Sequence, residues 1–258
     1  MPVVGGVEKK NRLISWLTAW GGAASLVISI GTGVYTFYTN EIRKPAEERL
    51  LSFQTHISSI NAVNQETQAK VLATTDPAQK MALINAANNQ KYILVNEAER
   101  IFSEISDKSE INPYDLYVLA SENSQMGRFD TMDKYIALAD QNAKNSGDPV
   151  TIAAVMVWKG KAVLARMGPS GIEKARSYFD QAPAELELSK TPDIHFRLAS
   201  LYGDMALIEA GVGDCDKSRQ DKKKFDDEIA FDPRNPGHQN LAQVTQGMLA
   251  SQQRCPML

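Results

Sequence analysis

Five prolines recur at nearly even spacing along the chain, and each follows a residue that suits a helix N-cap or the start of a turn. Proline is favoured at the first position of a helix, where its missing N–H would have no partner and the preceding side chain caps free amides. The spacings are 36, 36, 43 and 44 residues, a period typical of stacked helical units. The pattern predicts an all-α fold and consists of Asp76-Pro77, Asn112-Pro113, Asp148-Pro149, Thr191-Pro192 and Asn235-Pro236.

The interval from Pro113 to Asp148 shows the internal order of one unit most clearly. Its first half has apolar residues at helical spacing, and Gly127 is suited to end that helix. A second helix is expected from Asp130 to Gly147, which gives a helix–turn–helix unit. The apolar face of the first helix consists of Leu116, Leu119 and Ala120.

The next two intervals repeat this order. Helices are expected from Pro149 to Gly168 and from Ile172 to Ala182, and a linker from Pro183 to Lys190 lengthens the period. A mostly polar last helix, from about Pro236 to Gln253, is expected to cap the stack, because a terminal unit has no neighbour to cover its outer face. Its expected packing side consists of Leu241, Val244 and Met248.

Thirteen positions in these units give the chain a family resemblance. They are Leu116, Ala120, Gly127 and Phe129 in the first unit, Gly160, Ala175, Phe179 and Ala182 in the second, and Leu198, Leu201 and the closing Phe231-Asp232-Pro233 in the third. On these positions, residues 113–235 resemble the tetratricopeptide repeat superfamily. The match is degenerate, since Met132 stands where the family usually has a small residue and the later units exceed its 34-residue repeat.

This resemblance implies an αα-solenoid in which the first helix of each pair lines a concave groove. The residues of the first unit that would face a protein partner there are Tyr114, Tyr117, Ser121 and Gln125, with Lys161 and Arg166 as further candidates from the second unit. Exposed tyrosines supply a large contact area at a low cost in side-chain entropy. The alternative is that both tyrosines pack against the preceding segment.

The longest stretch without a charged residue runs from Leu13 to Asn40. A helix of that length spans about 42 Å, enough for a bilayer core with its interfaces. Tryptophans near one end and a Tyr/Phe cluster near the other match the aromatic belts of a membrane span. The apolar region is longer than that of a cleaved signal peptide and ends in bulky aromatic residues, so we expect a single uncleaved transmembrane helix.

Small residues recur every fourth position in this span and would let another membrane helix approach closely. They are Gly21, Ser25, Ser29 and Gly33. Three Lys/Arg residues precede the span and three follow it, so charge alone decides orientation weakly. Long domains translocate largely regardless of charge, which favours a cytoplasmic tail (residues 1–12) with the rest of the chain outside.

Residues 41–111 show a different pattern, with heptad-like stripes on two long helices separated at Asp76-Pro77. An antiparallel hairpin spacer is the simplest arrangement, and an intermolecular coiled coil is the alternative. Asn64 and Asn88 interrupt the two stripes. They either fix register or oligomeric state, or are imperfect positions of a short hairpin.

The chain has two cysteines, one near the start of the helix that follows Gly213 and one just past the last helix. If those two helices pack antiparallel, Cys215 and Cys255 become neighbours, and we therefore predict a disulfide between them. Two unrelated free thiols are the alternative. Because disulfides persist in oxidising compartments, the bridge supports an extracytoplasmic repeat domain, residues 112–258.

No pattern for catalysis, a cofactor or a metal is evident. The chain lacks a phosphate-binding P-loop, a Gly-x-Ser-x-Gly turn, a Ser-x-x-Lys pair and a His-Glu-x-x-His helix. Its net charge of −3 and pI of about 5.7 do not suit a nucleic-acid binder. We therefore expect no enzyme activity, no catalytic, metal-binding or cofactor-binding residues, and no nucleic-acid partner.

These features predict a single-pass membrane protein that serves as a helical-repeat adaptor or scaffold for a protein partner in the periplasmic or extracytoplasmic space. Its layout is similar to that of bacterial tetratricopeptide proteins that accompany secretion or envelope-assembly machines. A cytoplasmic-facing adaptor of the same build is one alternative. A self-assembling structural membrane subunit, a homo-oligomer formed through the small-residue stripe and the heptad segment, is another.

Overall fold

A computed structural model describes residues 44–252 together with 254 and 255, and every regular element in these ranges is a helix. The expected membrane helix of residues 13–40, with Gly21, Ser25, Ser29 and Gly33, lies outside the described residues. Within the part of the chain that is described, no helix combines the length and the apolar character needed to cross a membrane. The expectation of an all-α chain is confirmed for the described residues.

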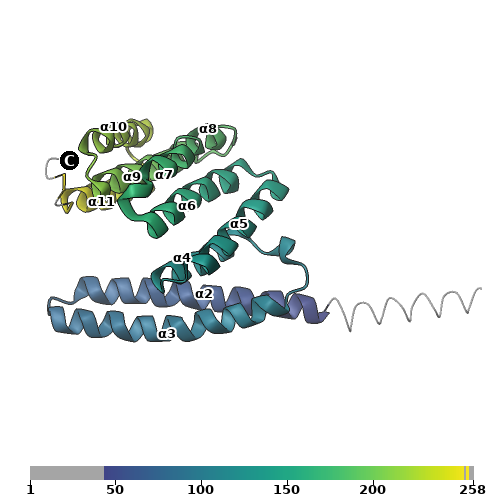
Figure 1. Cartoon of the computed structure of the whole chain (residues 1–258). Helices are drawn as coiled ribbons and strands as arrows, with labels where there is room; N and C mark the ends of the chain where they lie inside the picture. The colour runs from purple at the N-terminus through teal and green to yellow at the C-terminus, as the bar shows by residue number, and fades with distance from the viewer. Residues whose placement is uncertain (1–43, 253, 256–258) are drawn as a thin grey trace, which may run out of the picture. The chain divides into compact units, whose positions relative to one another are not determined.

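Two long helices form the hairpin expected for residues 41–111, α2 (Lys44–Ala73) and α3 (Pro77–Glu104) (Figure 1). Their outer ends, residues 44–56 and 97–106, form one compact unit. There the Phe53 and Phe102 rings lie 6.0 Å apart between centroids, and Arg49 Nε lies 3.9 Å from Glu104 Oε2. An early residue of α2 thus faces a late residue of α3, which makes the pairing antiparallel.

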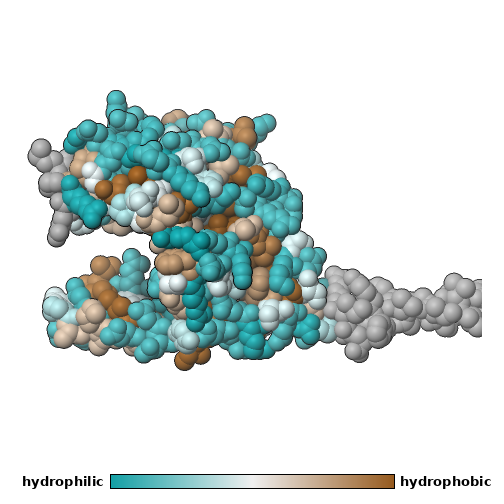
Figure 2. Space-filling view, in the orientation of Figure 1, coloured by the Kyte–Doolittle hydropathy of each residue, from teal (hydrophilic) through white to brown (hydrophobic). Residues whose placement is uncertain are grey.

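The remaining part of the hairpin, residues 57–96, belongs to a second unit with residues 107–255. Its seam is apolar at first, with Ile57, Ile60 and Val95 buried. Towards the turn the seam becomes polar, and Asn64, Thr67 and Asn88 line a cavity of about 310 Å³. Leu72 and Met81, on either side of the turn, are exposed. Hydrophobic surface is visible at the turn end of the hairpin in Figure 2.

Successive helix pairs make up the rest of the second unit, each helix packed against its neighbours in sequence. Their bounds are α4 (Pro113–Gln125), α5 (Phe129–Ser146), α6 (Pro149–Met167), α7 (Ile172–Phe179), α9 (Ile194–Val212), α10 (Cys215–Phe231) and α11 (Pro236–Ala250). Two short 3₁₀ turns, η2 (Lys108–Glu110) and η3 (Gly168–Gly171), precede α4 and α7.

The proline pattern marks the helix starts as expected, with one exception. The side chains of Asp76, Asn112, Asp148 and Asn235 accept hydrogen bonds from amides at the starts of α3, α4, α6 and α11. The exception is Thr191-Pro192, because α9 begins only at Ile194 and its N-cap residue makes no capping hydrogen bond.

The expected linker at residues 183–190 is wrong in part, because α8 (Ala182–Glu187) forms within it. This short helix packs against α6 and α9 and buries Ala182 and Leu186. Two apolar side chains four residues apart therefore provide a helical face that the polar composition of the segment had hidden.

The packing side expected for the last helix is wrong in part, because only Leu241 of its three residues is partly buried and shares a face with Thr245 and Leu249. Val244 and Met248 of α11 are 48% and 44% exposed, and the buried residues are His238, Thr245 and Leu249. Thr245 Cγ2 would lie 3.2 Å from a Cβ at Gly203, so α11 meets the α9 backbone closely. At this close contact between α11 and α9, the small side chain of Thr245 fits, whereas a longer side chain such as that of Met248 would not.

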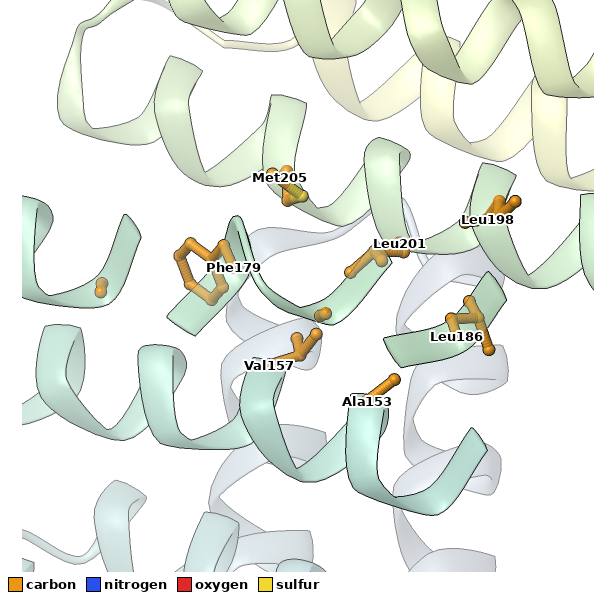
Figure 3. Close-up of a cluster of buried hydrophobic side chains, with 9 residues drawn as sticks. Ala153, Val157, Phe179, Leu186, Leu198, Leu201 and Met205 are labelled. Carbon is orange, nitrogen blue, oxygen red and sulfur yellow. The ribbon is translucent and has the colours of Figure 1, made fainter. Parts of the chain in front are cut away.

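A large apolar cluster lies between α6, α7, α8 and α9. Figure 3 shows Phe179 and Met205 on one side of it, Leu186 and Leu198 on the other, and Leu201 between them. The Phe179 ring lies directly on the backbone of α6, since a Cβ at Gly160 would fall 2.2 Å from Phe179 Cε1. Glycine at position 160 is therefore a packing requirement of this pair.

Candidate protein-binding groove

Three aromatic side chains connect α4 and α6, which are the first helices of two successive helix pairs. The Tyr117 ring stacks on Trp158 at a centroid distance of 4.3 Å and an interplanar angle of 9°. The Tyr114 ring meets the same indole edge-on, at 4.9 Å and 79°. Trp158 is buried while Tyr114 stays 42% exposed. The tyrosines thus pack forward on the next pair rather than on the preceding segment, and one ring remains open to a ligand.

A pocket of about 290 Å³ opens beside Tyr114, with walls from α4, α6 and α9. Its apolar lining includes Val157, Phe196 and Leu201, whereas Lys161 and Asp204 lie among its polar residues. A second pocket, of about 190 Å³, is lined by Tyr117 and Ser121 of α4 and by several α6 residues. Trp158 and Lys161 line both pockets. We call the two pockets together the groove.

The charged residues of the first pocket are paired with one another. Lys161 Nζ lies 2.7 Å from Asp204 Oδ2, and Arg197 Nη2 lies 2.9 Å from Asp193 Oδ2. The buried Nε of Arg197 has no hydrogen-bond partner among the described residues. The pocket therefore carries two cations and two anions, and one buried N–H group of Arg197 has no acceptor among the described residues.

Burial and ion pairing shift the pKa of three of these groups. Burial opposes the charged form of Lys161, but the Asp204 carboxylate outweighs it and raises the pKa of this amine above its usual value. The hydrogen bond from Arg197 lowers the pKa of Asp193, and burial raises the pKa of Tyr114. At neutral pH the first pocket thus presents a neutral phenol and ionised, mutually neutralising pairs.

The structure brings three of the four predicted groove residues to the groove. Tyr114 lines the first pocket, and Tyr117 and Ser121 line the second. Gln125 lies elsewhere, where its Oε1 accepts a hydrogen bond from Lys91 Nζ at 3.2 Å.

Of the two further candidates, Lys161 lines the groove, but Arg166 pairs with Asp130 and Asp133 of α5 and lines a separate pocket. Sequence reasoning missed the groove residues of α9, Phe196, Arg197 and Asp204. Only apolar positions of this helix, such as Leu198 and Leu201, had been named from the sequence, and the groove candidates came from the first two units alone.

A buried polar cluster joins the hairpin to α4. Lys91 Nζ lies 3.0 Å from Glu122 Oε2, and Asn64 Nδ2 donates to Glu122 Oε1 at 2.9 Å. Lys91 and Glu122 are only 6% and 2% exposed. Asn64 thus has its hydrogen-bond partner on α4, so a contact within one chain accounts for this polar position in the heptad stripe.

The two cysteines lie at bonding distance. Cys215 and Cys255 have an S–S distance of 1.99 Å and a Cα–Cα distance of 5.5 Å across 40 residues of sequence. Cys255 is buried in a small cluster with Ala206, Ala210 and Leu249. The bridge therefore holds the segment after α11 against the C-terminal half of α9 and the start of α10.

Acidic, histidine and cysteine side chains do not gather into a set suited to a metal ion within the described ranges. His195 Nδ1 lies 2.7 Å from Glu228 Oε2, and its ring stacks on Phe231 at 3.4 Å between centroids. This contact holds α9 to α10 on the side of α9 that faces away from the groove cations.

Comparisons with protein-family models, curated proteins and solved structures found no match to this chain.

Proposed function

We propose that this chain is a membrane-anchored adaptor of the tetratricopeptide-like helical-repeat type, whose groove binds a segment of a protein partner. The observation that carries the proposal is the open tyrosine beside a pocket formed by the first helices of three successive pairs. Such a site suits an extended segment that places an apolar side chain against Tyr114. The internally neutralised charge favours a ligand segment of low net charge.

The proposed location is the extracytoplasmic space, with residues 13–40 as the anchor and the N-terminal tail in the cytoplasm. The Cys215–Cys255 geometry supports it, because such a bridge persists where the environment is oxidising. The small-residue stripe in the anchor would pair with a membrane subunit of an envelope or secretion-related complex. The chain would then act as an accessory subunit of that complex.

Site-specific photocrosslinking in native membranes tests the binding role. A benzoylphenylalanine at Ser200, which lines the first pocket, should give an adduct with another protein, whereas the same residue at exposed Lys223 on α10 should not. Filling the pocket with Ala154→Trp should abolish the Ser200 adduct, and Ala230→Trp on exposed surface should leave it unchanged. An adduct that persists with Ala154→Trp would contradict a groove site, and an adduct only with a second copy would favour self-assembly.

Labelling of a Lys223→Cys variant in intact cells tests the location. A membrane-impermeant maleimide should react with this exposed position without lysis of the inner membrane. Reaction only after lysis would place the helical pairs in the cytoplasm and leave the groove proposal standing.

A further inference from the structure

Three helices, α6, α9 and α11, share a sequence pattern in which a proline at or just before the helix start is followed eleven residues later by a glycine. The pairs are Pro149 and Gly160, Pro192 and Gly203, and Pro236 and Gly247. Gly160, Gly203 and Gly247 therefore recur at intervals of 43 and 44 residues, in α6, α9 and α11, so the glycine sites can be compared.

In α6 and α9 the glycine makes room for a phenylalanine of the helix that follows. A Cβ at Gly160 would lie 2.2 Å from Phe179 Cε1 of α7, and a Cβ at Gly203 would lie 3.2 Å from Phe225 Cδ2 of α10. Each ring therefore rests on exposed backbone of the preceding helix. In both pairs the missing side chain is what lets the two helices come this close.

The third glycine has no such neighbour. No described atom lies within 4 Å of a Cβ position at Gly247, and the structure describes no helix after α11. α11 nevertheless has the orientation of a first helix, because its buried Thr245 and Leu249 correspond to buried Leu201 and Met205 of α9, 44 residues earlier.

The surface around Gly247 also differs in character from the other outer helix at this end. α10 has ten charged residues among 17, and hydrophilic residues dominate this part of the surface in Figure 2. The 15 residues of α11 include no Asp, Glu, Lys or Arg. Val244 and Met248, half-exposed beside Gly247, give this helix an uncharged, partly apolar outer face, which is typical of a surface that is covered in use.

We propose that this surface, formed by Gln243, Val244, Gly247 and Met248 and here called the Gly247 face, binds an α-helix of a partner protein that places an aromatic ring on Gly247. The occupant follows from the two filled copies of the same site, in which a helix contributes a phenylalanine at this point. The bound helix completes a fourth pair, with its apolar side on α11. This surface lies on a different helix from the groove, so the inference does not depend on the proposed function.

A peptide taken from the chain itself provides the probe. The peptide spans residues 214–232, the helix that covers Gly203, and has Cys215→Ser. It also has Asp221→Ala, because α7 has Ala175 at the corresponding position, four residues before its phenylalanine. Titration of the fluorescent peptide with the full chain should show saturable binding. A peptide that also has Phe225→Ala should bind at least about tenfold more weakly.

Matched variants of the full chain locate the binding site. Gly247→Gln should weaken the peptide at least about tenfold, whereas Gly211→Gln, at another helical glycine with open space around it, should not. The Gly247→Gln chain should keep or slightly raise its Tm, because glutamine is the better helix former, so lost binding would not reflect unfolding. The proposal would be overturned if the peptide did not bind the full chain, or if it bound the Gly247→Gln chain equally well. It would also be overturned if the groove variant Ala154→Trp lost peptide binding.

Crosslinking identifies the source of the helix. Benzoylphenylalanine at Gln243 in native membranes should give an adduct that maps to a helix of a different protein and close to an aromatic residue of it. Gly247→Gln should remove this adduct, and the Ser200 adduct of the groove should remain. An adduct on residues 1–43 of the same chain, or on α11 of a second copy, would overturn the assignment to a partner protein.

Discussion

The middle helix pair, α6–α7, and the last pair, α9–α10, use the same glycine–phenylalanine contact but differ in what surrounds it. Around Phe179 the cluster is entirely apolar, with contributions from α6, α8 and α9. Around Phe225 the buried residues of α10 are Ser218 and Asp221, and the nearby apolar cluster is small. Apolar burial therefore stabilises the middle pair, whereas the last pair has to be held by other means.

Polar and covalent links supply that stabilisation at the last pair. Arg176 of α7 lies 2.6 Å from Glu209 Oε2 and 2.5 Å from Asp214 Oδ2, which ties α7 to the end of α9 and to the N-cap of α10. Glu209 is 2% exposed, so this carboxylate depends on its partner. Together with the Cys215–Cys255 bridge, these contacts show that the source of stability changes from one helix pair to the next.

Removing the disulfide should have the largest effect and should be confined to the last pair. The variant Cys215→Ser/Cys255→Ser loses a link across 40 residues, which amounts to about 4 kcal/mol in the chain-entropy model. Hydrogen exchange should then become faster in α10 and α11 while α6 and α7 keep their protection. Equal acceleration in both pairs would show that they unfold as one unit and would remove the distinction.

The two filled glycine sites should respond unequally to the same substitution. Gly160→Ala places a methyl group 2.2 Å from a ring carbon of a fully packed core, so we expect a loss of about 3 kcal/mol in the free energy of unfolding. Gly203→Ala meets Phe225 and Thr245 at 3.2 Å, and the better helix propensity of alanine offsets much of the cost, leaving about 1 kcal/mol or less. Denaturant titrations measure both, and losses of equal size would mean that the last pair is packed as rigidly as the middle one.

Asp221 should give the smallest effect and the one that depends on pH. It is fully buried, its Oδ2 has no hydrogen-bond partner among the described residues, and burial raises its pKa above the usual value despite Lys224 and Lys217 nearby. The folded state then binds this proton more tightly than the unfolded state, so stability rises as the pH falls through the folded pKa towards the unfolded value.

Asp221→Asn removes this titration. It should raise the free energy of unfolding by about 1 kcal/mol at neutral pH, because the substitution removes a buried charge whose Oδ2 has no hydrogen-bond partner among the described residues, and should abolish the gain on acidification. Thermal unfolding of both chains from pH 7 to pH 4 measures the difference. Parallel curves for the two chains would show that Asp221 does not contribute to the pH dependence.

Local signals in the sequence were sufficient for the order of the described helices other than α8. The Asp/Asn-Pro steps and Gly147 mark real helix ends, because capping and left-handed glycine conformations depend on neighbouring residues only. The face that each helix buries depends on its partners, which is why the α11 stripe was placed partly on the wrong side. The same limit applies to the groove: Tyr114, Tyr117 and Ser121 were found from their place in one helix, but Arg197 and Asp204 gain their meaning only when α9 lies beside α6.

The salt bridge between Lys91 and Glu122 affects how the protein can be produced in pieces. A fragment that stops at residue 111 would contain Lys91 and Asn64 without the carboxylate that both bind. During synthesis the ammonium group likewise has no acceptor until α4 has emerged and folded. Fragments that contain the helical pairs should therefore start before residue 57, since the hairpin half up to Asn96 and the pairs that follow form one compact unit.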